Sequence, residues 1–191
     1  MVNVIFAGVG GQGVILASKV LMEVAKDKGY DVKESEVHGM AQRGGSVDCN
    51  VRYGEKVYSP LIEKGTADYV VSFEELEILR KIDYLSPDGA VIVNREKIDP
   101  APVQTGAMSY PDDIQEWTKS RVKQAHFLDT TGALKEAGSK KALNILMLGY
   151  LSRFLEFTDE QWEKAIKSLV KEKFVELNIK AFRLGREMKS Y

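Results

Sequence analysis

The chain has 191 residues, which suits one α/β domain that buries a single core without metals or disulfides. Its 27 Lys and Arg residues balance 28 Asp and Glu residues, so it lacks the basic excess of proteins that bind nucleic acid or anionic membranes. Cys49 is the only cysteine, which excludes an internal disulfide and, within this chain alone, a cysteine-ligated iron–sulfur cluster.

The N-terminus has no signal-peptide pattern, because the chain runs directly into the apolar segment Val2 to Ala7 and a glycine loop. The longest apolar run, Leu143 to Leu151, is interrupted by polar and small residues and falls short of the roughly 20 residues that span a bilayer. We therefore expect a cytoplasmic protein with neither a membrane nor a nucleic-acid partner.

The first elements are predicted to be a strand, a glycine turn and a helix. Val2 to Ala7 is short and partly β-branched, and Val14 to Lys28 carries a helical stripe of apolar residues that stops at Gly29. Asp31 to Val37 is a second predicted strand. The alternating segment Val47 to Tyr53 is a third, and a turn at Gly54-Glu55 is expected to pair it with Lys56 to Tyr58 as an antiparallel hairpin.

The remaining elements complete an alternation of strands and helices, followed by a helical end. In chain order we predict a strand at Ala67 to Phe73, a helix at Glu74 to Ile82, a turn at Ser86 to Gly89 and a strand at Ala90 to Asn94. An irregular excursion from Ile98 to Pro111 and a strand at Gln124 to Asp129 follow. Three helices are predicted at the end: one at Lys140 to Leu155, one that begins at the capping pair Thr158 and Gln161, and one at Lys173 to Met188. This order predicts one domain over residues 1–191, a three-layer α/β/α fold with a Rossmann-like mixed sheet and a helical C-terminal portion.

A glycine-rich loop lies between the first strand and the first helix. Gly8, Gly10 and Gly13 fit the G-x-G-x-x-G pattern of dinucleotide sites, and Glu34 or Glu36 follows at about the distance of a ribose-binding acid. Glycines admit close approach of another group, and free N–H groups at a helix start attract anions. The loop therefore suits a phosphate, a carboxylate or a partner's backbone, although the same glycines would also permit a simple tight turn.

A second glycine-rich motif, His38 to Ser46, follows the second strand and has no counterpart in a nicotinamide-binding fold. Loops at the carboxyl ends of neighbouring parallel strands share one sheet edge, so we expect the two loops to form one surface. On it Arg43 would offer a bidentate donor for an anion, and Gln12, Gln42 and His38 would offer neutral hydrogen bonds.

Together the two motifs carry a family resemblance. The sequences Gly8-Val9-Gly10-Gly11-Gln12-Gly13-Val14 and Glu36-Val37-His38-Gly39-Met40-Ala41-Gln42-Arg43-Gly44-Gly45-Ser46 resemble the gamma-type domain of 2-oxoacid:ferredoxin oxidoreductases, and the longer motif is similar to the indolepyruvate type. Weaker similarities, such as Tyr58-Ser59-Pro60 and the Asn144 to Gly149 stretch, extend the resemblance over nearly the whole chain.

The resemblance implies a subunit that is inactive alone and that completes a larger partner. The partner would bind thiamine diphosphate and 4Fe–4S clusters, and the holoenzyme would convert an aryl pyruvate and coenzyme A (CoA) to an aryl-acetyl-CoA while reducing ferredoxin. The residues placed at this contact are Gly8, Gly10, Gly11, Gln12, Gly13, His38, Gln42, Arg43, Gly44 and Gly45. No catalytic residue and no metal ligand is expected on this chain.

Two alternatives remain open from the residues. The glycine loop and the downstream acids also fit a freestanding NAD- or FAD-binding oxidoreductase, which isothermal titration with either nucleotide tests. The loops also fit a non-catalytic regulatory subunit that binds CoA or another anion, and an isolated chain could form a homo-oligomer. Cys49 alternates with buried positions, so we expect an inert core thiol.

Overall fold

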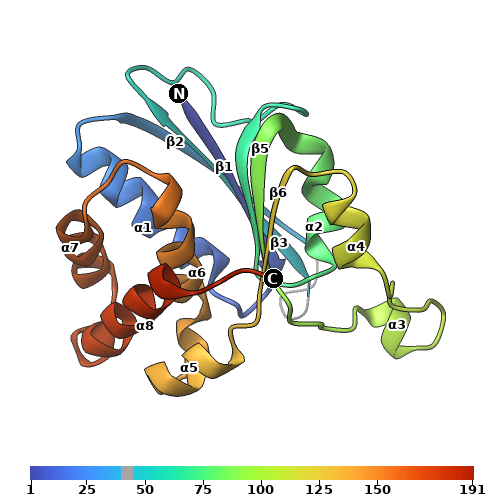
Figure 1. Ribbon diagram of the computed structural model, residues 1–191. Coiled ribbons are helices and arrows are strands. Elements are labelled where there is room, and N and C mark those ends of the chain that lie inside the picture. Colours follow the sequence, from blue (N-terminus) through green and yellow to red (C-terminus); the bar gives the residue numbers. More distant parts are fainter. Residues whose placement is uncertain (40–44) are drawn as a thin grey trace.

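The computed structural model describes residues 1–39 and 45–191, which form a mixed sheet with helices on both faces (Figure 1). The strands follow the order β2-β3-β1-β4-β5-β6 across the sheet. Their bounds are β1 Val2–Val9, β2 Asp31–His38, β3 Ser46–Gly54, β4 Ala67–Ser72, β5 Leu85–Asn94 and β6 Gln124–Leu128. The three-layer α/β/α prediction is thereby confirmed.

Strand β1 explains why the sheet needs cover on both faces. Its residues from Val4 to Ala7 are all buried, and alternate side chains enter opposite cores, because Val4 and Phe6 belong to one apolar cluster and Ile5 to the other. Parallel neighbours β4, β5 and β6 continue the sheet on one side of β1.

The predicted hairpin between Val47 to Tyr53 and Lys56 to Tyr58 is wrong. Strand β3 pairs antiparallel with β1 on one side and with β2 on the other, so both of its edges are occupied. The segment after Gly54 leaves the sheet instead, where the backbone N–H of Val57 donates to Asp31 Oδ2 at 3.0 Å and the Arg52 guanidinium donates to the carbonyls of Ser59 and Leu61. These long-range partners are invisible to a local pattern of alternation.

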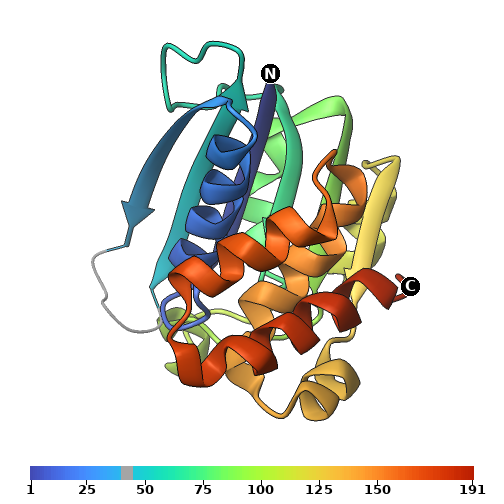
Figure 2. The same ribbon diagram turned by 90° about the vertical axis from the view of Figure 1, so that its left-hand side faces the viewer.

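Two groups of helices cover the sheet. Figure 2 shows α1, α7 and α8 in front of one face, with α6 behind them against the strands, whereas α2 and α4 cover the other face in Figure 1. The bounds are α1 Val14–Asp27, α2 Glu77–Lys81, α3 Ala101–Gln104, α4 Ile114–Lys119, α5 Thr131–Ala137, α6 Leu143–Leu151, α7 Asp159–Leu169 and α8 Val175–Glu187. Among the described residues, every helix falls short of the length and apolarity needed to cross a bilayer.

Several local predictions are confirmed and others are corrected. The capping box of Thr158 and Gln161 opens α7 as expected. The turn expected at Ser86 to Gly89 is instead part of β5, where the pairing with β4 shifts register. Short helices α4 and α5 were not predicted, because six or seven residues carry too little periodicity to separate them from loop.

Candidate functional site

Four parallel strands bring their carboxyl ends to one edge of the sheet, at the lower end of the molecule in Figure 1. Because β3 runs antiparallel to β1, its first residue lies at the same edge. We call this the carboxyl edge, and it consists of the strand ends Val9, Ser46, Ser72, Asn94 and Leu128 with the loops that follow or precede them. Ligands of open α/β sheets bind at such edges.

The glycines of the first loop have separate roles. Gly11 and Gly13 have left-handed φ values of 106° and 80°. A Cβ at Gly13 would lie 2.5 Å from Asn144 Nδ2, and one at Gly8 would lie 2.8 Å from Val14 Cγ2, so a side chain at either position would displace its neighbours. Gly11 is exposed and a Cβ there would meet nothing within 4 Å. It leaves an open tip at the carboxyl edge.

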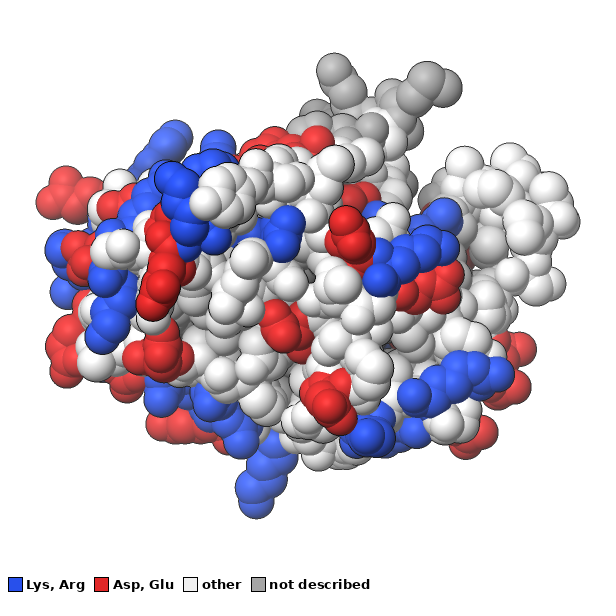
Figure 3. Space-filling model, turned by 90° about the horizontal axis from the view of Figure 1, so that it is seen from above, with Lys and Arg blue, Asp and Glu red and all other residues white. Residues whose placement is uncertain are grey.

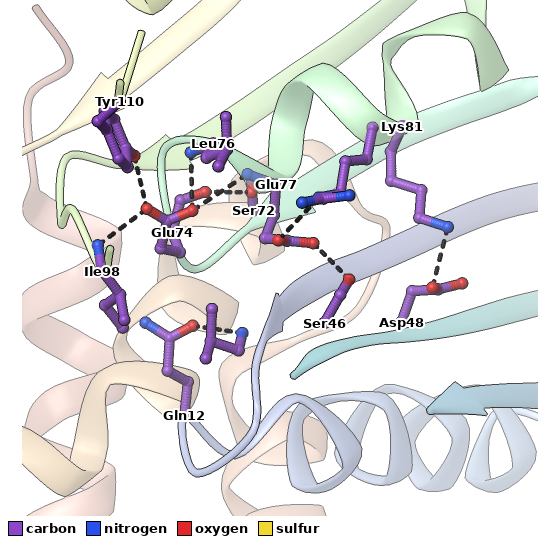
Figure 4. Close-up of polar contacts among 12 residues, drawn as sticks. Gln12, Ser46, Asp48, Ser72, Glu74, Leu76, Glu77, Lys81, Ile98 and Tyr110 are labelled. Atoms are coloured by element: carbon purple, nitrogen blue, oxygen red, sulfur yellow. Dashed lines mark hydrogen bonds and ion pairs between the residues drawn. The ribbon is translucent and has the colours of Figure 1, made fainter. Parts of the chain in front are cut away.

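Gln12 is the amide that ties three loops together. Its Oε1 accepts from Val9 N at 2.8 Å, and its Nε2 donates to Phe73 O at 3.0 Å and to Glu96 Oε2 at 3.1 Å. The loops after β1, β4 and β5 are thereby joined by one side chain, which Figure 4 shows beneath the Glu74 cluster. Gln12 contributes to the edge by holding the tip at Gly11 in place.

The described ends of the two predicted loops do meet, although β1 and β2, the strands that precede the loops, are separated in the sheet by β3. Gly10 N donates to Gly45 O at 2.9 Å, and Gly39 N donates to Ser46 O at 2.8 Å. His38 is the last residue of β2, which β3 separates from β1. Of the predicted contact residues, Gln42, Arg43 and Gly44 lie outside the described residues, so their roles stay predictions.

Buried acids secure the start of β3 to α2, and sequence reasoning missed them. Glu77 is 4% exposed; its Oε2 accepts from Ser46 Oγ at 2.5 Å and its Oε1 from Arg80 Nε at 3.1 Å. Two residues along β3, Asp48 pairs with Lys81 at 2.9 Å (Figure 4). The signal in the sequence was a run of carboxylates directly after a buried strand.

Glu74 is the most deeply buried of these acids, at 1% exposure. Its carboxylate accepts four hydrogen bonds, from the backbone N–H groups of Leu76, Glu77 and Ile98 and from the Tyr110 hydroxyl at 2.6 Å (Figure 4). Burial raises the pKa of Glu74 above its ordinary value, against the opposing effect of these donors. Glu74 thus joins the end of β4 to both ends of the excursion after β5.

A cavity of about 470 Å³ opens beside the glycine loop. It adjoins the loop through Glu96, which accepts from Gln12, and through Leu143, the neighbour of Asn144. It is lined by the three cationic residues Arg95, Lys135 and Lys140, by the carboxylates Glu96 and Asp129, and by the hydroxyl-bearing residues Thr130, Thr131 and Ser139. This mixture suits an anionic ligand with polar groups.

One described group of side chains has metal-ligating atoms in close proximity. The ligand atoms of Glu34, Glu36 and Cys49 lie within 4.8 Å of one another. However, Glu34 already accepts from Ser18 Oγ, and burial raises the pKa of the Cys49 thiol to about 12. A thiol that stays protonated is a poor ligand and a poor nucleophile, so Cys49 fits the inert core role expected for it.

The fold and the carboxyl edge define a class: an α/β protein that presents an open glycine tip, a bridged set of loops and an anion-suited cavity on one edge of a mixed sheet. Its topology departs from dinucleotide-binding sheets, because β3 stands between β1 and β2 and moves the acids of β2 away from the glycine loop.

Comparison with known proteins places the chain within that class. Residues 3–188 match the family model described as pyruvate ferredoxin/flavodoxin oxidoreductase, and the chain belongs to this family. It is 37% identical to the IorB subunit of indolepyruvate oxidoreductase from Thermococcus kodakarensis, over 96% of this chain and 93% of the relative.

More distant relatives preserve the fold in other assemblies. The crystal structure of a keto/oxoacid ferredoxin oxidoreductase gamma subunit from Geobacter sulfurreducens superposes with a TM-score of 0.72 at 25% identity, covering 98% of this chain and 97% of that one. The VorA subunit of ketoisovalerate oxidoreductase from Methanothermobacter marburgensis is 26% identical over 97% of this chain, which corresponds to only 36% of that longer relative. The same domain therefore occurs both as a separate subunit and as part of a longer chain.

Proposed function

We propose that this chain is the smaller, cluster-free subunit of an indolepyruvate:ferredoxin oxidoreductase. The holoenzyme cleaves the bond between the carboxylate and the carbonyl carbon of an aryl pyruvate, releases carbon dioxide, passes the electron pair to ferredoxin and transfers the acyl group to CoA. The observation that carries the proposal is the similarity to the indolepyruvate oxidoreductase subunit over nearly the full length of both chains.

The residues of this chain agree with a supporting role. A single buried cysteine with a raised pKa does not fit an iron–sulfur cluster, so the clusters and thiamine diphosphate are assigned to the larger subunit. What the chain offers is a rigid edge with Gly11 at its tip, against which a partner's backbone or a cofactor can pack closely. The contacts predicted for His38, Gln42, Arg43 and Gly44 are proposed to complete this surface.

The cavity favours a CoA-facing role for this edge over direct thiamine contact. Arg95, Lys135 and Lys140 line a space beside the glycine loop, and cations of this kind bind phosphate groups. CoA carries such groups at the end remote from its thiol. A charge reversal at Lys140 is expected to raise the KM for CoA and leave the KM for the oxoacid unchanged, and an unchanged KM for CoA would remove this role.

Reconstitution tests the proposal as a whole. The chain is produced with and without the larger thiamine and iron–sulfur subunit, and CoA-dependent reduction of a viologen dye is followed with indolepyruvate, phenylpyruvate, pyruvate and 2-oxoglutarate. We expect activity only in the complex and preference for the aryl substrates. Calorimetric titration of the isolated chain with NAD and FAD is the control, since tight binding of either would favour the freestanding oxidoreductase instead.

A further inference from the structure

Residues 100–111 form a segment, here called the arm, that contains no charged residue although charged residues make up 29% of the chain. The arm leaves the carboxyl edge after β5, includes α3 and returns to α4. Figure 3 shows a lobe at the upper right of the molecule that carries no blue or red atoms, whereas charged residues lie along the right-hand edge below it. Most of its residues are exposed, none is buried, and Met108 is 66% exposed.

The arm is ordered by its own hydrogen bonds. Pro102 O accepts from the backbone N–H groups of Ala107 and Met108 at 2.9 and 3.1 Å, and Gln104 Nε2 donates to Asp99 O at 2.6 Å. Three of the five prolines of the chain lie in it, Pro100, Pro102 and Pro111, and each removes backbone freedom. A segment so organised, in which only Tyr110 packs against an apolar core and Met108 stays exposed, is preorganised for a surface outside this chain.

The base of the arm is attached to the sheet by a buried carboxylate. Glu74 Oε1 accepts from Ile98 N at 3.0 Å on the outgoing side and from the Tyr110 hydroxyl on the returning side, so one oxygen fixes both ends. Lys97 Nζ also lies 5.1 Å from the centre of the Tyr110 ring. Burying a carboxylate is unfavourable unless it is fully bonded, and four donors here meet that condition.

Charged groups surround the arm at its base. Arg95, Lys97, Asp112 and Asp113, which flank the arm in the chain, line a hollow of about 450 Å³ together with residues of α4. An apolar centre with a polar rim is the usual anatomy of a protein–protein interface. The arm follows β5 and Gly11 follows β1, so both features lie at the carboxyl edge of the sheet.

We propose that the arm is a docking element for the larger, thiamine-binding subunit, with Met108 at its apolar centre. This inference rests on the proposed function, which supplies the partner. Two observations favour that occupant: the arm leaves the same edge of the sheet as the glycine loop, and in the VorA relative this domain accounts for only 36% of a longer chain. A second copy of this chain is the competing occupant, and the test separates the two.

The test compares Met108→Asp with Leu61→Asp as a matched control, because the two side chains are 66% and 61% exposed. Leu61 belongs to the segment beside Arg52, which pairs with Asn3 at the amino end of β1, opposite the carboxyl edge. Association with the purified larger subunit is measured by sedimentation velocity. We expect Met108→Asp to weaken association at least about tenfold, since an unpaired charge would be buried, and Leu61→Asp to stay within about twofold of the wild type.

A photo-crosslinking residue at position 108, with the same residue at position 61 as control, identifies the occupant in the reconstituted complex. Crosslinking of position 108 to the larger subunit supports the proposal, whereas crosslinking only to a second copy overturns it. If the wild type associates with the larger subunit and Met108→Asp associates equally well, the docking role is overturned and the proposed function stands. Failure of the wild type to associate overturns both.

Discussion

Gly11→Val tests whether the open tip of the glycine loop serves a partner or only makes a turn. The valine Cβ would meet no neighbouring atom within 4 Å, so the only steric cost in the isolated chain is the local backbone strain. The left-handed φ of 106° costs an L residue about 1–2 kcal/mol, and the reduced freedom of valine in the unfolded chain offsets about 0.4–1 kcal/mol of this. The net loss of about 1 kcal/mol lowers the melting temperature of a domain of this size by about 2–4 °C.

Gly29→Val provides the matched control. Gly29 is exposed, has a φ of 95° and would also place its Cβ in open space. It follows the last turn of α1, while Gly11 precedes the first, and the 14 residues of that helix separate the two sites by about 21 Å. The backbone strain is therefore comparable and only the position differs.

Both variants are examined by thermal unfolding monitored by circular dichroism, by sedimentation with the larger subunit and by indolepyruvate-dependent dye reduction. We expect similar small losses of thermal stability in the two variants, and a loss of association or turnover of about tenfold or more in Gly11→Val alone. Wild-type assembly and turnover of Gly11→Val, or equal losses in both variants, would refute the argument that the tip is a contact surface.

Three further predictions concern the framework beneath this edge. Glu74→Gln replaces one acceptor with a donor facing two N–H or O–H groups and should lower the free energy of urea unfolding by about 1–3 kcal/mol. Because the folded pKa of Glu74 is raised, the contribution of Glu74 to stability is fully present below the ordinary value of 4.5 and is lost as pH rises through the folded pKa. The stability difference between wild type and variant should therefore shrink with rising pH, and a constant difference would contradict this. Gly185→Ala would place a Cβ 1.9 Å from Leu146 O and force α6 and α8 apart, costing about 1–3 kcal/mol or more, whereas Gly132→Ala, with nothing within 4 Å, should leave stability unchanged or higher. Cys49, with its pKa near 12 and no exposure, should react with a thiol reagent at neutral pH only after unfolding, and rapid labelling of the native chain would disprove its burial.

The elements with strong periodicity could be predicted from the sequence. The β1–loop–α1 unit, the alternating β3 and the capping box of α7 are all encoded within a few neighbouring residues. The strands that pair with β3 could not be predicted, because the alternation of apolar and polar residues shows which face of a strand is buried and not which strands lie beside it. A hairpin with Lys56 to Tyr58 was the shortest connection, whereas Asp31 and Arg52 hold the following segment away from the sheet.

The outline of the candidate site could be predicted from the sequence, but the role of the residues that hold its loops in place, here called the supports (Gln12, Glu74 and Glu77), could not. The glycine pattern and the following motif correctly indicated two loops at one edge, and Gly10 does contact Gly45. The sequence did not distinguish Gly11 from Gly13, since that difference depends on Asn144, which approaches from far along the chain. Nor did it reveal Glu74, whose partners come from the segment on the other side of β5.

The supports themselves indicate how this chain contributes to turnover. Gln12 joins three loops, Glu77 holds the start of β3 and Glu74 fixes the base of the arm, so hydrogen bonds within this chain connect the described loops of the carboxyl edge without a partner. Preorganisation of this kind lowers the entropic cost of association and keeps a composite site in register. Substitutions at the tip or the arm should therefore weaken assembly, while substitutions at the three supports should lower stability first and assembly as a consequence, and the order of these two losses in a graded series distinguishes surface from support.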